Sequence, residues 1–137
     1  ITRYIAVDGE KKEQIADSCA EMFANNGVII KNAPVLMVLT YIKGRSGYER
    51  DGSFTTSKGD RWQMFDAGIA SQSFCLAAYE QGLGSVILGI FDDAKVASIL
   101  EIPENQEVAA LIAVGYPDEE PAAPKRKPVA DLLSFIH

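Results

Sequence analysis

The glycines of the stretch GLGSVILGIFD, residues 82–92, are the first candidates for chemistry in this sequence. A loop that holds the phosphates of a dinucleotide reads G-x-G-x-x-G, follows a strand and opens a helix. Gly82 and Gly84 instead follow an expected helix and precede an apolar run, so they are typical of a helix end and a tight turn. Gly89 ends the apolar run, where a glycine either allows a simple turn or lets a flat ligand approach the backbone.

A second candidate is the run of three cations Lys125, Arg126 and Lys127 in an otherwise acidic, proline-rich tail. Such a run either binds a phosphate through charge-assisted hydrogen bonds or is a solvated surface cluster. The only histidine is the last residue, His137, so a Ser/His/Asp or Cys/His catalytic site is not expected. The residues also predict no metal site, and an enzyme of this composition would take its chemistry from a bound organic cofactor.

Length and composition predict one domain with a substantial core, because the chain has 137 residues of which 47% are hydrophobic. The formal net charge of -6 argues against nucleic acid as a partner. No run is long and apolar enough for a membrane span, and no signal peptide is recognisable. We therefore expect a cytoplasmic protein in which Cys19 and Cys75 are reduced, buried thiols.

Periodicity predicts alternating strands and helices, and hence a mixed α and β class. The strands are expected at residues 2–7, 35–39, 86–88 and 108–114, the last three as buried strands. Helices are expected at residues 8–24, 62–81 and 92–100, with Asp8 and Asp92 as N-caps and with Asn25-Asn26-Gly27 as a left-handed stop. The stretch 44–60 is rich in Gly, Ser and charged residues, which predicts a mobile surface loop that could serve as a lid.

The long helix expected at residues 62–81 should position whatever site the chain forms. It is nearly uncharged and carries many small residues, so we expect it to be buried in the fold or in an interface. Trp62 and Phe65 lie at its start, next to the expected loop. They are either pocket-lining aromatics or ordinary core and dimer-contact residues.

The region FDAGIASQSFCLAAYEQGLGSVILGIFDDAKVASILEIPENQEVAALIAVGYPDEEPAAPKRKP, residues 65–128, resembles the nitroreductase family of FMN-dependent NAD(P)H oxidoreductases. The resemblance rests on the order of five pieces: the helix running into LAAYEQGLGS, the strand ILGIFD, the turn ILEIPENQEV, the strand end AVGYP, and the Arg-x-Pro tail. It is looser over residues 2–41.

The resemblance implies an α+β fold with a mixed, largely antiparallel sheet flanked by helices. It also implies a homodimer built around the long helix, with FMN at the interface and with a tail, residues 118–137, that reaches the partner subunit. The segment Ile87, Leu88, Gly89 and Ile90 would lie against the flavin ring, and the Gly89 N–H would bond flavin N5. Arg126, helped by Lys125, would match the family's phosphate-binding cation.

The implied activity is transfer of a hydride from NAD(P)H through flavin N5 to a nitroaromatic, a quinone or a similar acceptor, with no catalytic side chain. Trp62 and Phe65 would line the acceptor pocket. The family's Arg-x-Ser-x-Arg-like and Pro-Ser/Asn-Gln-Pro-like motifs are not found in this sequence, which begins inside an expected strand. We therefore expect residues 1–137 to form a single domain that lacks the family's N-terminal part. Two alternatives stay open, a non-catalytic flavin- or ligand-binding member and a cofactor-free fragment.

Overall fold

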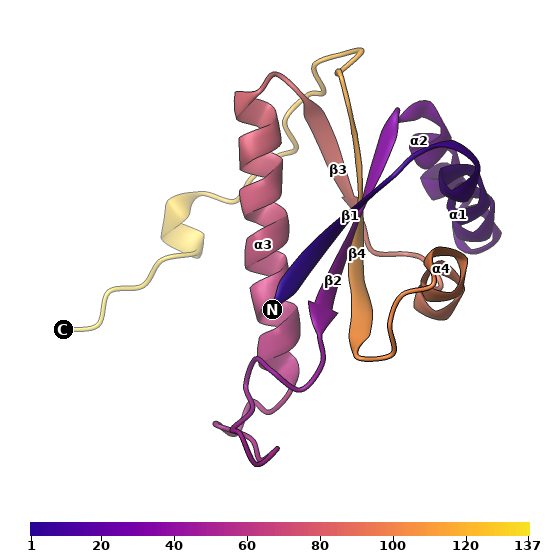
Figure 1. The fold of residues 1–137 in the computed structure, drawn as a ribbon. Helices are drawn as coiled ribbons and strands as arrows, with labels where there is room; N and C mark the ends of the chain where they lie inside the picture. The colour runs from indigo at the N-terminus through magenta and orange to yellow at the C-terminus, as the bar shows by residue number, and fades with distance from the viewer.

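Four antiparallel strands form one sheet in the order β1-β2-β4-β3 in a computed structural model that describes all of residues 1–137 (Figure 1). The strands are β1 Thr2–Val7, β2 Val35–Ile42, β3 Gly84–Leu88 and β4 Gln106–Gly115. The two central strands, β2 and β4, are nearly continuous apolar runs because helices cover both of their faces. The strands expected at residues 2–7, 35–39 and 108–114 are confirmed, and so is the α+β class.

The helices divide unequally between the two faces of the sheet (Figure 1). On one face lie α1 Gly9–Met22, α2 Ala24–Asn32 and α4 Asp93–Leu100, and on the other lies α3 Arg61–Glu80 alone. The main core fills the three-helix side with fully buried aliphatic side chains, among them Ile15, Leu36, Val38, Val96 and Leu111. The α3 side holds a much smaller core of Leu39, Tyr41 and Ala67. Only one side of the sheet is thus packed as deeply as a domain core requires.

The predicted stop at Asn25-Asn26-Gly27 is wrong, because α2 runs straight through these residues. The break between α1 and α2 falls at Phe23, whose backbone is extended. Gly27 lies against α1 so closely that a Cβ on it would be 2.6 Å from the Cβ of Ala20. Close helix packing therefore explains this glycine better than a turn does, and tertiary contact has overridden a local turn signal.

Two other end signals are confirmed, whereas Asp8 stands at the N-cap position of α1 but its side chain makes no capping hydrogen bond. The Asp92 carboxylate accepts a hydrogen bond of 3.0 Å from the Lys95 N–H and so caps α4. Gly82 follows α3 with a φ of +76°, a left-handed conformation that favours glycine.

The expectation of a buried strand at residues 86–88 is only partly met. Leu88 is buried, but Val86 and Ile87 are 42% and 46% exposed, because β3 pairs only with β4 and forms the edge of the sheet. Cys19 is buried as expected, whereas Cys75 is only half-buried, and both cysteines are free thiols.

The segments outside the sheet and its helices have little regular structure. Between β2 and α3 the chain forms turns with one isolated bridge from Tyr48 to Phe54. Every residue from 116 to 137 is exposed, and the only regular element there is the single turn η1 Val129–Asp131. This tail leaves the end of β4 and extends past α3 on the side away from the sheet (Figure 1). None of the helices is both long and apolar enough to cross a lipid bilayer.

Candidate functional site

The segment that follows β3 presents free backbone at the edge of the sheet. Gly89 is exposed, its N–H donates to no acceptor in the chain, and its φ is not in the left-handed region. A Cβ added to Gly89 would meet nothing within 4 Å. Neither backbone conformation nor packing within this chain therefore requires a glycine at this position. A flat molecule that lies against the backbone would supply the missing reason.

The side chains beside Gly89 form an apolar border. Ile87 and Ile90 are 46% and 49% exposed, while Leu88 between them points into the core. The segment 87–90 is held in place by Asn26, whose side-chain amide donates a 2.9 Å hydrogen bond to the Ile90 carbonyl. Asn26 is itself buried on α2, so a helix that was not predicted from the sequence positions this segment.

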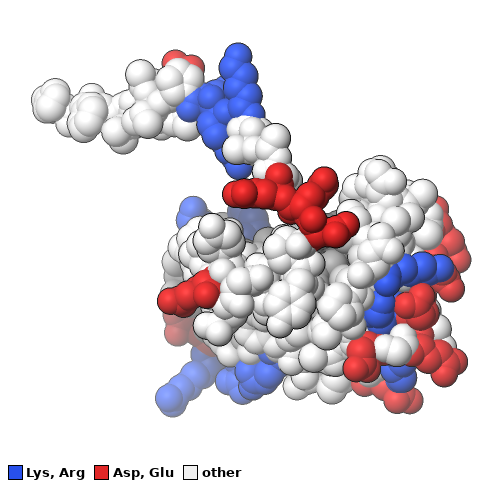
Figure 2. All heavy atoms as spheres, turned by 90° about the horizontal axis from the view of Figure 1, so that it is seen from above, with Lys and Arg blue, Asp and Glu red and all other residues white.

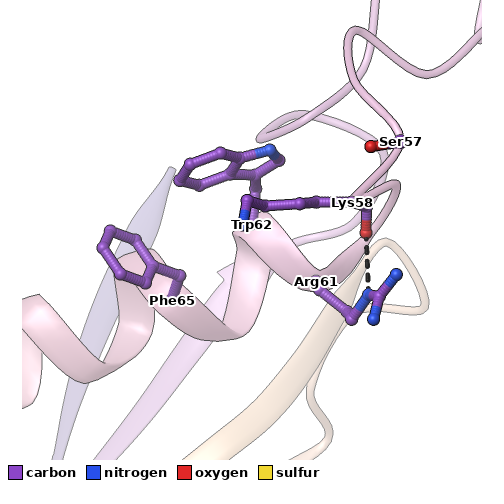
Figure 3. Close-up of a pocket in the computed structure, with 5 residues that line it drawn as sticks. All are labelled: Ser57, Lys58, Arg61, Trp62 and Phe65. Carbon is purple, nitrogen blue, oxygen red and sulfur yellow. Dashed lines mark hydrogen bonds between the residues drawn. The ribbon is translucent and has the colours of Figure 1, made fainter.

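A second feature, which we call the aromatic pocket, lies where the loop between β2 and α3 meets the start of α3. It has a volume of about 410 Å³ and is lined by Ser57, Lys58, Arg61, Trp62 and Phe65 (Figure 3). The Trp62 and Phe65 rings meet edge to face, with centroids 5.3 Å apart. The structure thus brings together the two aromatic residues that the sequence analysis singled out.

The loop fixes the orientation of the Trp62 ring. The indole Nε1 donates a 2.8 Å hydrogen bond to the Thr56 hydroxyl. Gly47, with a φ of +84°, lies against the same ring, and a Cβ on it would be 3.0 Å from Trp62 Cδ1. The loop and the first turn of α3 therefore form one packed unit, which presents a pre-positioned aromatic wall.

The exposed face of α3 is largely apolar, with the exposed Gln72 as a polar residue within it. Five large side chains on it are at least half exposed: Met64, Phe65, Ile69, Leu76 and Tyr79. Gly68 lies in the middle of this helix, where glycine costs about 1 kcal/mol relative to alanine. A Cβ on Gly68 would meet nothing within 4 Å, so nothing in this chain explains the residue. In the single chain the helix is therefore half-exposed, and its burial against a partner stays a prediction.

Lys125 and Arg126 lie on the exposed tail, and neither has a carboxylate within ion-pair distance. Figure 2 shows the basic cluster part-way along the projecting tail, beyond an acidic group at the point where the tail leaves the body. No hydrogen bond or ion pair joins these cations to residues 87–90. The structure of one chain therefore leaves the two expected cofactor-binding groups separate.

Two residues of these sites were not recognised as site residues from the sequence. Asn26 was assigned to a turn, because Asn-Asn-Gly is a strong turn signal and the hydrogen bond to Ile90 spans 64 residues. Lys58 was hidden among the charges of the loop. Its place four residues before Trp62 was the available signal, but Lys58 precedes the helix, so helical spacing did not apply.

Comparison with known proteins shows which family this sequence matches. The sequence profile described as "Nitroreductase family" matches residues 7–116. The NADPH-flavin oxidoreductase of Vibrio harveyi is 29% identical over 129 residues, which cover 88% of this chain and 50% of that protein. The chain spans about half the length of the curated relatives that it matches.

Solved structures agree in fold. A nitroreductase family protein from Streptococcus pneumoniae superposes with a TM-score of 0.82 at 22% identity, covering 98% of this chain and 78% of that one. A structure described as an FMN-dependent nitroreductase, from Clostridium difficile, has a TM-score of 0.67 at 28% identity, covering 90% of this chain and 68% of that one.

Proposed function

Because this chain belongs to the nitroreductase family, we propose that it acts as an FMN-dependent oxidoreductase that uses NAD(P)H to reduce a nitroaromatic, quinone or similar acceptor. The observation that carries the proposal is the exposed Gly89, a glycine with a free N–H and no reason for it within the chain. Two of the similar proteins, an NADPH-flavin oxidoreductase and an FMN-dependent nitroreductase, support the same choice of cofactor and reductant.

The groups present suit a flavin mononucleotide. The half-exposed Ile87 and Ile90 offer apolar contact to a flat ring, and the unpaired Gly89 N–H offers a donor to one of its ring nitrogens. Lys125 and Arg126 have no carboxylate partner and can neutralise a phosphate. When bound, FMN supplies the hydride-accepting and electron-donating chemistry that no side chain of this protein provides.

The chain itself positions the backbone beside the cofactor and excludes water from the acceptor. Asn26 holds the Ile90 carbonyl and thereby restrains the backbone next to Gly89. Trp62 and Phe65 shape a place for an aromatic acceptor and shield it from water. No proton donor among the side chains is required in this proposal.

The proposed assembly is a homodimer in which the apolar face of α3 is covered by a second copy. Five large apolar side chains on one helix face form an exposed patch of the kind that marks protein interfaces. Gly68 would let the partner's backbone approach closely. A dimer also gives the exposed tail, residues 118–137, a surface to lie on, so that Lys125 and Arg126 reach a phosphate at the interface.

The direct test is a visible absorption spectrum of the purified protein, before and after NADPH is added without oxygen. Flavin bands that bleach are expected. A protein that stays colourless after incubation with FMN contradicts the proposal, and a yellow protein that NADPH does not bleach indicates a non-catalytic flavin-binding member.

The variant Gly89→Val separates cofactor binding from folding. No atom lies within 4 Å of a Cβ at this position, so the melting temperature of the cofactor-free variant should match that of the parent protein. A ring that lies against the backbone would clash with the valine, so FMN affinity should fall at least tenfold, about 1.4 kcal/mol. Unchanged FMN affinity would place the flavin elsewhere.

A further inference from the structure

We infer that the aromatic pocket selects electron acceptors whose aromatic ring carries a negatively charged substituent, such as a carboxylate or a sulfonate. Lys58 is the residue that binds this substituent. The inference rests on the proposed function, because it names the acceptor class of the same site.

Lys58 lies across the aromatic wall. Its Nζ is 5.6 Å from the centroid of the Trp62 ring, a cation–π distance. Figure 3 shows the side chain of Lys58 extended over Trp62, on the same side of α3 as Phe65. Two cations, Lys58 and Arg61, and two aromatic rings therefore border one hollow of about 410 Å³. This combination offers both a stacking surface and a charge partner to a small anionic aromatic molecule.

The ammonium group of Lys58 has no anionic partner within the chain. The four ion pairs of the protein use Lys11, Lys12, Lys31 and Lys95. Of the carboxylates close in sequence, Asp66 accepts a hydrogen bond from Ser46, and Asp60 forms no ion pair with Lys58. Lys58 is exposed, so its charge is available to a ligand.

The backbone of Lys58 is held in place, although its side chain is free. The Arg61 N–H and Nε both donate to the Lys58 carbonyl, at 3.3 and 3.0 Å. This bond turns the Arg61 guanidinium away from the Trp62 ring (Figure 3). Arg61 also lines the pocket, but its Nε is bound to the Lys58 carbonyl, whereas the Lys58 ammonium lies over the Trp62 ring. The geometry therefore assigns contact with the charge of a stacked ligand to Lys58.

The net negative charge of the protein makes an unpaired cation beside the pocket important for binding an anion. With a formal net charge of -6, the chain repels anions at long range. An unpaired cation beside an aromatic hollow offsets that repulsion at one place. The effect should weaken as salt is added, because the pair is exposed and screened within about 10 Å at 0.1 M ionic strength.

Trp62 is the only tryptophan, so its fluorescence reports binding in this pocket without any need for turnover. The probes are 4-nitrobenzoate and the neutral 4-nitrobenzyl alcohol, with free tryptophan as the reference for collisional quenching. We expect the parent protein to bind the anion more tightly than the alcohol. The Lys58→Gln variant should lower this affinity ratio about fivefold, the effect of an exposed charge pair of about 1 kcal/mol.

Two matched variants make the result specific. Lys58→Arg keeps the charge and should keep the preference, while Lys43→Gln removes an exposed loop cation that does not line the pocket and should leave the affinity ratio as in the parent. An affinity ratio that Lys58→Gln does not change would overturn the inference.

Turnover measurements then separate this inference from the proposed function. The ratio of kcat/KM for the two nitro compounds should follow the affinity ratio. The difference between the parent protein and the Lys58→Gln variant should appear in KM. Charge-selective quenching of Trp62 without NADPH-dependent turnover would refute the oxidoreductase and leave the anion site standing. Turnover that does not distinguish the two compounds would refute the anion site alone.

Discussion

Glycine serves different purposes at three positions of this protein. Gly27 is required within the chain, because a Cβ would be 2.8 Å from the Ala16 carbonyl oxygen. Gly89 and Gly68 have open space around them and no left-handed backbone, so their reasons lie outside the chain. We assign a flat cofactor to Gly89 and a second subunit to Gly68. A glycine that neither the backbone conformation nor the packing of the chain requires thus indicates contact with another molecule.

Tyr41 is the residue whose protonation is most strongly coupled to folding. Burial, together with its hydrogen bond to Glu107, raises the pKa of the Tyr41 hydroxyl well above the value of an exposed tyrosine. Because the folded pKa is the higher one, this contribution to stability is complete below the unfolded pKa of about 10 and is lost as the pH rises above it.

We predict that Tyr41→Phe costs about 1 kcal/mol of unfolding free energy at pH 7, because one hydrogen bond is lost. The difference between the parent protein and the variant should shrink by about 1 kcal/mol between pH 9 and pH 11. Denaturant unfolding across this range measures it. Tyr116→Phe is the matched control, because Tyr116 is 84% exposed, and it should show neither effect. A constant difference at all pH values would contradict the coupling.

Among the elements, α3 is the one that we propose as the subunit interface. It is the only α-helix on its side of the sheet, and three of its four buried residues, Ala67, Ser71 and Ala78, are small. The opposite face of the helix carries exposed large side chains. A charged side chain placed there would be buried without a partner when two copies meet.

We therefore predict that Ile69→Lys raises the dissociation constant of the dimer at least tenfold, or about 1.4 kcal/mol. Sedimentation velocity over a range of protein concentrations measures this constant. Val28→Lys is the control, because Val28 is similarly exposed, at 56%, but lies on α2 across the sheet. A parent protein that sediments as a monomer at tens of micromolar would refute the proposed dimer.

Most elements could be predicted from the sequence, because long apolar runs and helical periodicity are strong signals. The central strands and α3 were found in this way, as were the caps at Asp92 and Gly82. The predicted stop at residues 25–27 failed, because the contact of Gly27 with α1 is tertiary. The exposure of Val86 and Ile87 was missed, since an apolar run does not reveal whether its strand lies at the edge of a sheet.

The candidate sites were predictable in part. The aromatic character of Trp62 and Phe65 and the exposure of Gly89 follow from the local sequence. Their supporting residues do not, because the bond from Asn26 to Ile90 and the position of Lys58 over Trp62 depend on the folded chain. The family resemblance was confirmed, whereas the cofactor-binding roles of Lys125 and Arg126 remain predictions.

On the scale of the whole molecule, the tail is structurally separate from the rest. All residues from 116 onward are exposed, and no side-chain hydrogen bond or ion pair anchors the segment from 122 to 137. Folding of the sheet and its helices therefore does not depend on that segment. Any function that it has must come from contacts made with a ligand or with another subunit.

We predict that deletion of residues 122–137 shifts the melting temperature of the cofactor-free protein by less than about 2 °C, since no buried residue is lost. The same deletion should weaken FMN binding more than tenfold, because charge-assisted hydrogen bonds are worth about 1.5–3 kcal/mol. Flavin fluorescence titration measures the affinity. The full-length variant Lys125→Gln/Arg126→Gln tests whether charge alone accounts for the loss. Equal FMN affinity in all three proteins would rule out a phosphate-binding role for the tail.

The order of strands in the sheet has a further consequence, for synthesis on the ribosome. The central ladder joins β2, residues 35–42, to β4, residues 106–115, so it cannot form until almost the whole sheet region has been translated. At about 5–20 residues per second, the apolar β2 waits several seconds with only β1 as a pairing partner. During that interval the nascent chain exposes the strand that later becomes the centre of its sheet. Chaperone capture and aggregation should therefore compete with folding most strongly in this window, before β4 emerges.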